Sequence, residues 1–199
     1  MRVKVAVLVS GGGTNLQALL DANLQHGEIA FVLSNRKAAY ALERARARGV
    51  ETAVLSNVME PDPVRRDEKL LEMLRARGIR VVALAGYLGI LGEKTVSAYE
   101  NRIVNIHPAL IPSFCGKGYY GLRVHEAALA RGVKVTGATA HLVNLGVDEG
   151  PILLQKAVDV LPGDTPETLQ KRVMEEAEWK LLPAAVDMVC QWAEEEETL

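Results

Sequence analysis

Strand-like and helix-like segments alternate along most of this 199-residue chain, and that rhythm constrains its fold more than any other feature. Short apolar runs rich in β-branched residues predict strands, and apolar residues spaced three or four apart predict helices. The predicted strands are Val3–Val9, Ile29–Leu33, Thr52–Leu55, Ile79–Ala85 and Ile103–Ile106; the predicted helices are Asn15–Asn23, Tyr40–Arg48, Val64–Arg77 and Glu93–Tyr99. Such alternation with short connections requires parallel strands joined by right-handed crossovers. The sequence therefore predicts an α/β fold with a doubly wound, mostly parallel sheet.

The rhythm changes after Pro108. A loop rich in glycine, proline and aromatic residues is expected at Ala109–Gly121, followed by a helix at Val124–Ala130. Two strand-like stretches, Lys134–Val143 and Pro151–Val160, predict an antiparallel addition near the carboxyl-terminal part of the sheet.

The last predicted helix opens at Asp164 and Thr165 and is expected to run to about Trp192. Pro183 should kink or break it, because proline lacks the N–H that a helix interior needs. The acidic end, Glu194–Glu197, is expected to be a frayed tail. The length and the lack of repeats or linkers predict one domain over residues 1–199.

Composition argues against nucleic-acid binding, because the formal net charge is −2 and a nucleic-acid-binding face is usually basic. The basic run Arg44, Arg46 and Arg48 is interpreted as a solvated helix face rather than a phosphate-reading patch. Cys115 and Cys190 are too few for a disulfide framework and too far apart for a zinc motif, and no other cluster has metal-ligand spacing. Without a signal-like or membrane-spanning segment, a cytoplasmic protein without a metal is expected.

A glycine-rich turn, Ser10–Asn15, separates the first predicted strand from the first helix. Glycines let the backbone approach an anion, while the helix start directs free N–H groups and the positive end of its dipole at that anion. Thr14 and Asn15 add side-chain donors, although both are also ordinary helix caps. No Gly-Lys-Ser/Thr follows, and no glycine stands three residues after Gly13. A phosphate monoester therefore fits better than a nucleoside triphosphate or a dinucleotide.

Asn105 and His107 end a buried strand and project to the same side of it. A carboxamide and an imidazole facing one cavity suit attack on an acyl carbon, because the amide can donate to an oxyanion and the imidazole can move a proton. No serine elbow or activated cysteine stands beside them. Direct transfer between two substrates is therefore expected rather than a covalent enzyme intermediate.

Asp148 lies in a turn between two predicted strands and could raise the pKa of a neighbouring histidine, or could simply be a turn residue. His141 is interpreted as either a second site residue or a satisfied core histidine. His26 and His125 are expected at the surface or on a helix. Cys115 is interpreted as a loop residue rather than a nucleophile.

Four motifs together resemble the phosphoribosylglycinamide formyltransferase family from about Val3 to Pro183. They are Ser-Gly-Gly-Gly-Thr-Asn-Leu-Gln-Ala-Leu at 10–19, Leu-Ala-Gly-Tyr-Leu at 84–88, Asn-Ile-His-Pro at 105–108 and Asp-Glu-Gly-Pro-Ile-Leu at 148–153. The resemblance implies a Rossmann-like formyltransferase fold and transfer of a formyl group from 10-formyltetrahydrofolate to glycinamide ribonucleotide. It implies small-molecule partners, without nucleic acid or membrane, and a monomer or homodimer.

The resemblance also implies roles for individual residues. Asn105, His107 and Asp148 would be the catalytic set, with a protonated His107 stabilising the oxyanion. The ribonucleotide would be held by Gly13, Thr14, Asn15 and Glu178, and the folate by Arg65, Leu88, Gly89, Ile90, Leu91, Asn105, Val143 and Val147. Arg66 is adjacent to Arg65 and is the alternative folate-side arginine.

Some positions depart from the family pattern. Gly12 stands where some members carry Asn. Gly89 stands where many members carry a basic residue. Glu149 follows Asp148 as it does in formyltetrahydrofolate hydrolases, so a hydrolase is one alternative. The others are a methionyl-tRNA formyltransferase, which would need a further carboxyl-terminal domain, and a non-enzymatic module that binds a phosphorylated ligand.

Overall fold

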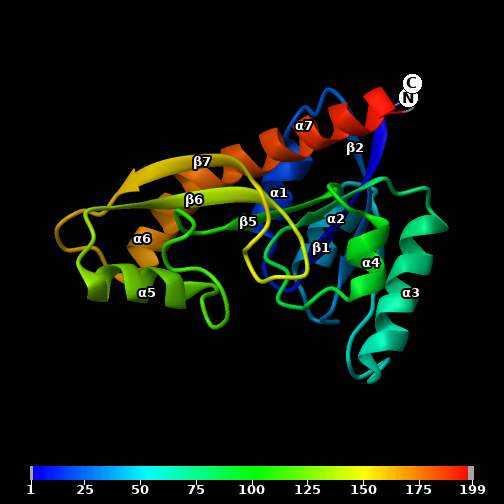
Figure 1. Ribbon diagram of the computed structural model, residues 1–199, viewed down its shortest axis with the longest axis horizontal. Helices are drawn as coiled ribbons and strands as arrows, with labels where there is room; N and C mark the ends of the chain where they lie inside the picture. Colours follow the sequence, from blue (N-terminus) through cyan, green and yellow to red (C-terminus); the bar gives the residue numbers. More distant parts are fainter. Residues whose placement is uncertain (1, 197–199) are drawn as a thin grey trace.

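A seven-stranded sheet in the order β3-β2-β1-β4-β5-β6-β7 organises the computed structural model, which describes residues 2–196 (Figure 1). The first five strands are parallel, whereas β6 runs antiparallel to both β5 and β7. The predicted doubly wound α/β fold with an antiparallel addition is therefore confirmed.

The observed elements match the predicted order. The strands are β1 (Val3–Val9), β2 (Gly27–Ser34), β3 (Glu51–Val54), β4 (Val81–Leu84), β5 (Ile103–His107), β6 (Val135–Leu142) and β7 (Ile152–Asp159). The helices are α1 (Thr14–Asp21), α2 (Ala41–Ala47), α3 (Pro63–Arg75), α4 (Glu93–Ala98), α5 (Leu122–Arg131), α6 (Pro166–Val173) and α7 (Trp179–Glu196), with a π-helical segment, η1 (Met174–Glu178), between the last two.

The sheet buries both of its faces, as its nearly continuous apolar strands require. In β1, Val5 and Val7 join the core beneath α1, α2 and α7, while Ala6 and Leu8 join the core beneath α3 and α4. Figure 1 shows α7 lying along one side of the sheet and α3 and α4 on the other. Period-two alternation along a strand thus supplies two cores.

The final helical region is interrupted at η1 rather than at Pro183, contrary to the prediction. α7 continues through Pro183, whose ring is buried. The π-helical turn ends at Glu178, five residues before Pro183. In such a turn the backbone hydrogen bonds join residues five apart instead of four. No helix within residues 2–196 has the length and apolar character needed to cross a membrane.

The acidic end is helical as far as the structure describes it, so the expected frayed tail is wrong for Glu194–Glu196; Glu197 lies outside the described residues. His26 Nδ1 lies 2.7 Å from a Glu194 carboxylate oxygen, and Glu196 pairs with Arg102. These contacts fasten the end of α7 to the segments that precede β2 and β5.

Candidate functional site

The site lies where β1, β4 and β5 end, because three consecutive neighbours in the sheet deliver their carboxyl ends to one edge. Ser10, at the end of β1, donates to Asn35 Oδ1 at 2.7 Å and accepts from the Leu88 amide at 2.8 Å. This buried hydroxyl links the glycine turn to the segment that follows β4.

Three successive carbonyls of the glycine turn accept hydrogen bonds from groups of the protein. Gly11 O accepts from the Ala41 amide at 3.1 Å, Gly12 O from Arg44 Nε at 2.8 Å, and Gly13 O from the Gln17 amide at 2.8 Å. Within residues 2–196, no group accepts a hydrogen bond from the amides of residues 12–15. Unpaired amides at a glycine turn that opens a helix form an anion site.

The expected solvated helix face is formed by two of the three arginines of the basic run, but not by Arg44. Arg46 and Arg48 are exposed and pair with Glu43 and Asp21, as a solvated face predicts. Arg44 is partly buried and lies against the glycine turn instead. Sequence spacing could not show this contact, because its acceptor is a backbone carbonyl 32 positions away.

Gly13 is required by both conformation and space. Its φ is 75°, and a Cβ there would lie 2.6 Å from the Ala41 Cβ. Any other residue would be strained and would push α2 away. The close approach of α2 is what brings Arg44 to the turn.

Asn15 and Glu178 form a buried pair beside that turn. Asn15 Nδ2 donates to Glu178 Oε2 at 2.6 Å, and Asn15 Oδ1 has no partner among the described residues. Burial raises the pKa of Glu178 to about 7, although the hydrogen bond from Asn15 acts in the opposite direction. The structure thus brings together two of the residues predicted to hold the ribonucleotide, and η1 supplies one of them.

The register between β5 and β6 places His141 opposite Asn105. Asn105 Nδ2 lies 3.0 Å from His141 Nε2, and His141 Nδ1 lies 2.8 Å from the Leu142 carbonyl. A carbonyl only accepts, so His141 Nδ1 donates to Leu142, and Nε2 is the ring nitrogen that faces Asn105. Of the two interpretations left open for His141, the structure places it in the site cluster.

His107 and Asp148 also meet, as predicted. His107 Nδ1 lies 3.5 Å from Asp148 Oδ2, and His141 Nε2 lies 3.6 Å from Asp148 Oδ1. His107 Nε2 donates to the Phe114 carbonyl at 2.8 Å. The Asp148 carboxylate therefore lies near one ring nitrogen of each of two histidines, His107 and His141.

The turn that carries Asp148 has an unusual backbone. Asp148 has a φ of 59°, a conformation that Asp adopts more readily than most residues, and its Oδ2 accepts from the Gly116 amide at 2.9 Å. Glu149 is exposed, and its carboxylate lies over Gly146 rather than in the His107 cluster. The two adjacent carboxylates thus have different surroundings.

The Asp148 charge acts to raise the pKa of His107, as expected, but burial has the larger effect. Burial lowers the pKa of His107, and this effect exceeds the opposing influence of the Asp148 charge and the Phe114 carbonyl. Burial acts to raise the pKa of Asp148, but contacts with His141 and Gly116 and the His107 charge outweigh it and hold that pKa below its usual value. The free protein at neutral pH accordingly has a neutral His107 beside an ionised Asp148.

His125 lies on α5, one of its two expected positions, and is completely buried there. Neither ring nitrogen has a partner among the described residues. Burial and the nearby His107 lower its pKa to about 4. The burial of His125 depends on how α5 packs against α6, which local sequence does not show.

The predicted folate-side residues lie on two loops with exposed apolar side chains. Leu88 and Ile90 follow β4, Val147 follows β6, and all three are exposed, whereas Val143 is half-buried. A Cβ at Gly89 would lie 2.6 Å from the Tyr87 ring, so a larger residue there requires that ring to move.

The two candidate folate-side arginines differ in surroundings. Arg65 is exposed and has a distant contact, 3.9 Å, with Asp62. Arg66 is partly buried, donates to the Glu60 carbonyl at 2.7 Å, and its charge acts on the Tyr87 hydroxyl. The structure therefore brings the charge of Arg66 near Tyr87, while the choice between Arg65 and Arg66 stays a prediction.

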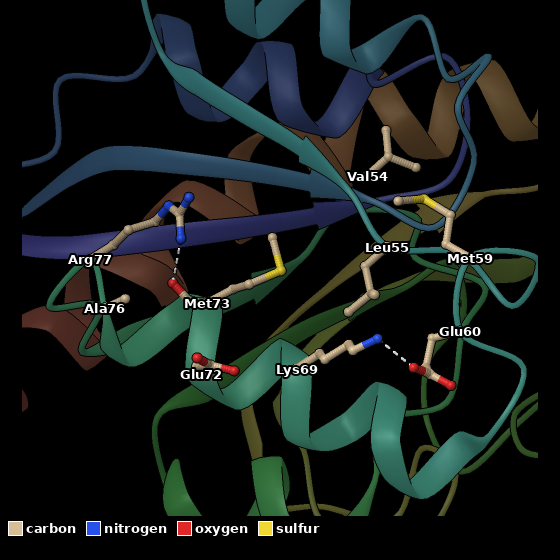
Figure 2. Close-up of a pocket in the computed structure, with 9 residues that line it drawn as sticks. All are labelled: Val54, Leu55, Met59, Glu60, Lys69, Glu72, Met73, Ala76 and Arg77. Atoms are coloured by element: carbon tan, nitrogen blue, oxygen red, sulfur yellow. Dashed lines mark hydrogen bonds and ion pairs between the residues drawn. The ribbon is translucent and has the colours of Figure 1, made fainter.

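A hollow of about 520 Å³ opens between α3 and the end of β3, away from this cluster (Figure 2). Its apolar floor includes Leu55 and Met73. Two charged side chains of its rim are paired, because Lys69 binds Glu60 and Arg77 binds Glu51. The Glu72 carboxylate also lines the hollow, so the rim holds no unpaired cation among the described residues for an anionic substrate.

The Cys115 thiol has no evident chemistry. Cys115 Sγ donates to the Pro112 carbonyl, and burial raises the pKa of its thiol, which disfavours the nucleophilic thiolate. Among residues 2–196, no group of three or more His, Cys, Asp or Glu side chains is arranged to hold a metal ion.

Several known proteins to which this chain is similar carry formyltransferase or transformylase names. Residues 3–186 match the model of the formyl transferase family. The chain is 41% identical to the chloroplastic phosphoribosylglycinamide formyltransferase of Arabidopsis thaliana over 96% of this chain, and 35% identical to the Haemophilus influenzae phosphoribosylglycinamide formyltransferase over 92%. The crystal structure of glycinamide ribonucleotide transformylase 1 from Symbiobacterium toebii superposes with a TM-score of 0.89 at 44% identity, covering 96% of this chain and 88% of that one.

The shared length differs among these relatives. The chain spans 66% of the Arabidopsis protein, just under two thirds, and 85% of the Haemophilus protein. Both glycine turn and polar cluster fall within the region matched by the family model.

Proposed function

The chain belongs to the formyl transferase family, and on that premise we propose that it transfers a formyl group from 10-formyltetrahydrofolate to the amine of glycinamide ribonucleotide. One observation carries the proposal: unpaired amides suited to a phosphate and a carboxamide–imidazole–carboxylate cluster lie at the same edge of one sheet. The phosphate would anchor the acceptor at residues 13–15, and Glu178 would contact the same substrate.

The donors for the transition state would be Asn105 and His107. Asn105 uses one amide hydrogen for His141 and retains the other, while the His107 Nε2–H is held by the Phe114 carbonyl. Attack by the amine turns the formyl oxygen into an oxyanion, which is a stronger acceptor than a carbonyl. The oxyanion would thus replace Phe114 as the acceptor of the His107 hydrogen bond.

Asp148 would then favour the charged ring. As negative charge develops at the Nε2 side of His107, the pKa of the imidazole rises, and the carboxylate 3.5 Å from Nδ1 stabilises a proton there. The attacking amine must lose a proton and the folate nitrogen must gain one. A group that is neutral at rest and charged in the intermediate suits that transfer.

The remaining features support the same proposal. Apolar residues of segments 88–91 and 143–147, most of them exposed, would hold the folate together with Arg65 or Arg66, and Asn105 would lie between the two substrates. We further propose a single formyltransferase domain over residues 1–199 that acts in the cytoplasm as a monomer or homodimer, without a metal or nucleic acid.

A turnover assay tests the proposal. With 10-formyltetrahydrofolate and glycinamide ribonucleotide, formylated nucleotide should form in equal amount to tetrahydrofolate, as measured by chromatography of the products. Without the nucleotide, folate deformylation should be slow, because water lacks the phosphate anchor that positions the amine. Rapid formate release that ignores the nucleotide would identify a hydrolase instead, and no turnover under any condition would favour a binding module.

A further inference from the structure

Arg44 stands apart from the other arginines of its segment in the contacts it makes. Its Nε donates to Gly12 O at 2.8 Å and its guanidinium also donates to Gln17 Oε1 at 3.1 Å. Its guanidinium carbon lies 5.1 Å from the centre of the Tyr40 ring. Within residues 2–196 it forms no ion pair, whereas Arg46 and Arg48 each do.

The geometry of a trans peptide converts this contact into a consequence for the turn. The carbonyl of Gly12 and the N–H of Gly13 belong to one peptide unit, and in a trans unit they point in opposite directions. The Ile111–Pro112 bond is the one cis bond among the described residues, so the Gly12–Gly13 unit is trans. Because Gly12 O points at Arg44, the Gly13 N–H points away from α2.

The neighbouring peptide units are fixed differently. Gly11 O and Gly13 O are held by the backbone amides of Ala41 and Gln17, which any sequence would supply. The middle unit joins two glycines, and glycine tolerates both signs of φ, so its own conformational preference does not fix its direction. A side chain, Arg44, supplies the fixing hydrogen bond.

We propose that Arg44 is a positioning residue that holds the Gly12–Gly13 peptide with its N–H toward the phosphate monoester of the acceptor substrate. Arg44 lies on the opposite side of the peptide from that ligand, so it acts through the orientation of one amide and not by direct contact. The inference rests on the proposed function for the identity of the ligand. Asn15 Oδ1, buried and unpartnered beside the same helix start, independently indicates a polar ligand there.

The test uses ribose 5-phosphate and ribose as probes, followed by NMR of the ¹⁵N-labelled full chain. Arg44→Met keeps an aliphatic stem but removes both donors and the cation over the Tyr40 ring. Arg46→Met is the matched control, since it removes the same charge from the same helix at a side chain that binds Glu43 and Thr52. Arg44→Gln is the second variant if the methionine lowers the melting temperature.

Arg44→Met should weaken ribose 5-phosphate binding about ten-fold, as loss of one well-oriented amide donor does, and should reduce the ligand-induced shift of the Gly13 amide. Arg46→Met should bind within about two-fold of the wild type, and ribose should bind all three proteins equally weakly. Equal losses in both variants would reduce Arg44 to a distant charge and overturn the proposal, as would unchanged binding by Arg44→Met. These measurements require no formyl transfer, so they stand whether or not turnover is found.

Discussion

The chemistry of the polar cluster depends on which ring nitrogen of each histidine faces the carboxylate. His107 and His141 each donate one N–H to a backbone carbonyl, so the other ring nitrogen of each faces Asp148. A carboxylate between two such nitrogens would stabilise a proton on either ring. Neither imidazole alone would show this property.

Removal of either partner should therefore abolish most turnover. His107→Ala and Asp148→Asn are each expected to reduce kcat by roughly 10²-fold or more, through loss of acid–base and oxyanion assistance. Asparagine tolerates the left-handed backbone of residue 148, so that variant should fold normally. Glu149→Gln, which neutralises the exposed neighbour, is the control and should retain most activity. Near-native rates in folded His107 and Asp148 variants would eliminate this cluster as the reaction centre.

Glu178 gives a pH-dependent prediction. Its pKa is raised to about 7 from an ordinary value of 4.5, so between these values the folded protein retains a proton that the unfolded chain has lost. The wild type should lose stability as pH rises from about 4.5 to 7, with no further loss from this group above that range. Glu178→Gln removes the penalty, so it should melt at a higher temperature than the wild type at pH 8 and at nearly the same temperature at pH 4.5.

The control for that measurement is Glu176→Gln, an exposed carboxylate in the same π-helical segment. Its melting temperature should follow the wild type at every pH. A pH-independent gain for Glu178→Gln would show that the carboxylate is ionised and well solvated in the folded protein.

At the scale of elements, the glycine turn and α2 are packed so closely that one methyl group should separate them. Gly13→Ala is expected to lower the free energy of unfolding by about 1–3 kcal/mol and to weaken binding of the phosphorylated substrate, because the residue has a φ of 75° and its Cβ would overlap Ala41. Gly12→Ala is the matched control, since a Cβ there has open space and its φ is not in the left-handed range. Urea denaturation and substrate binding measure both effects, and equal stability of the two variants would contradict the overlap.

Local sequence patterns predicted which segments are helices and which are strands. They did not predict the irregularities within these elements, such as the π-helical turn. Alternating apolar residues placed Asn105 and His107 on one strand face, since side-chain direction in a strand depends on parity alone. Assigning His141 to the site required the pairing of β5 with β6, which spacing along the chain does not reveal. Pro183 is an exception to the general rule against proline in helix interiors, since it lies inside α7, after a π-helical turn. Arg44 and His125 depend on packing between elements distant in sequence, so composition could place them only on helices.

For the molecule as a whole, α7 packs against six strands of the sheet and joins its two halves. Asp187 in α7 accepts hydrogen bonds from the backbone amides of residues 25–27, at 3.1, 2.8 and 3.3 Å, where the chain enters β2. Asp187→Ala should lower the free energy of unfolding by about 2 kcal/mol, because three donors lose a charged acceptor while solvent compensates in part.

Urea denaturation checks that value, and the slope of the transition should stay unchanged because the same surface is exposed on unfolding. Gln191→Ala, which removes an exposed contact within α7 to Glu195, is the control and should change stability by less than about 0.5 kcal/mol. Equal stability of the Asp187 variant and the wild type would mean that α7 is held by its apolar face alone.

The pairing of Asn105 with His141 across β5 and β6 also limits how the gene can change. Side chains in a strand alternate between faces, so one codon inserted or deleted within either strand would turn its remaining site residue to the opposite face. The loop from Ala109 to Gly121 carries no such parity and can change length more freely. Inherited insertions and deletions should therefore accumulate in that loop and be purged from the two strands beside it, even where substitutions in those strands are tolerated.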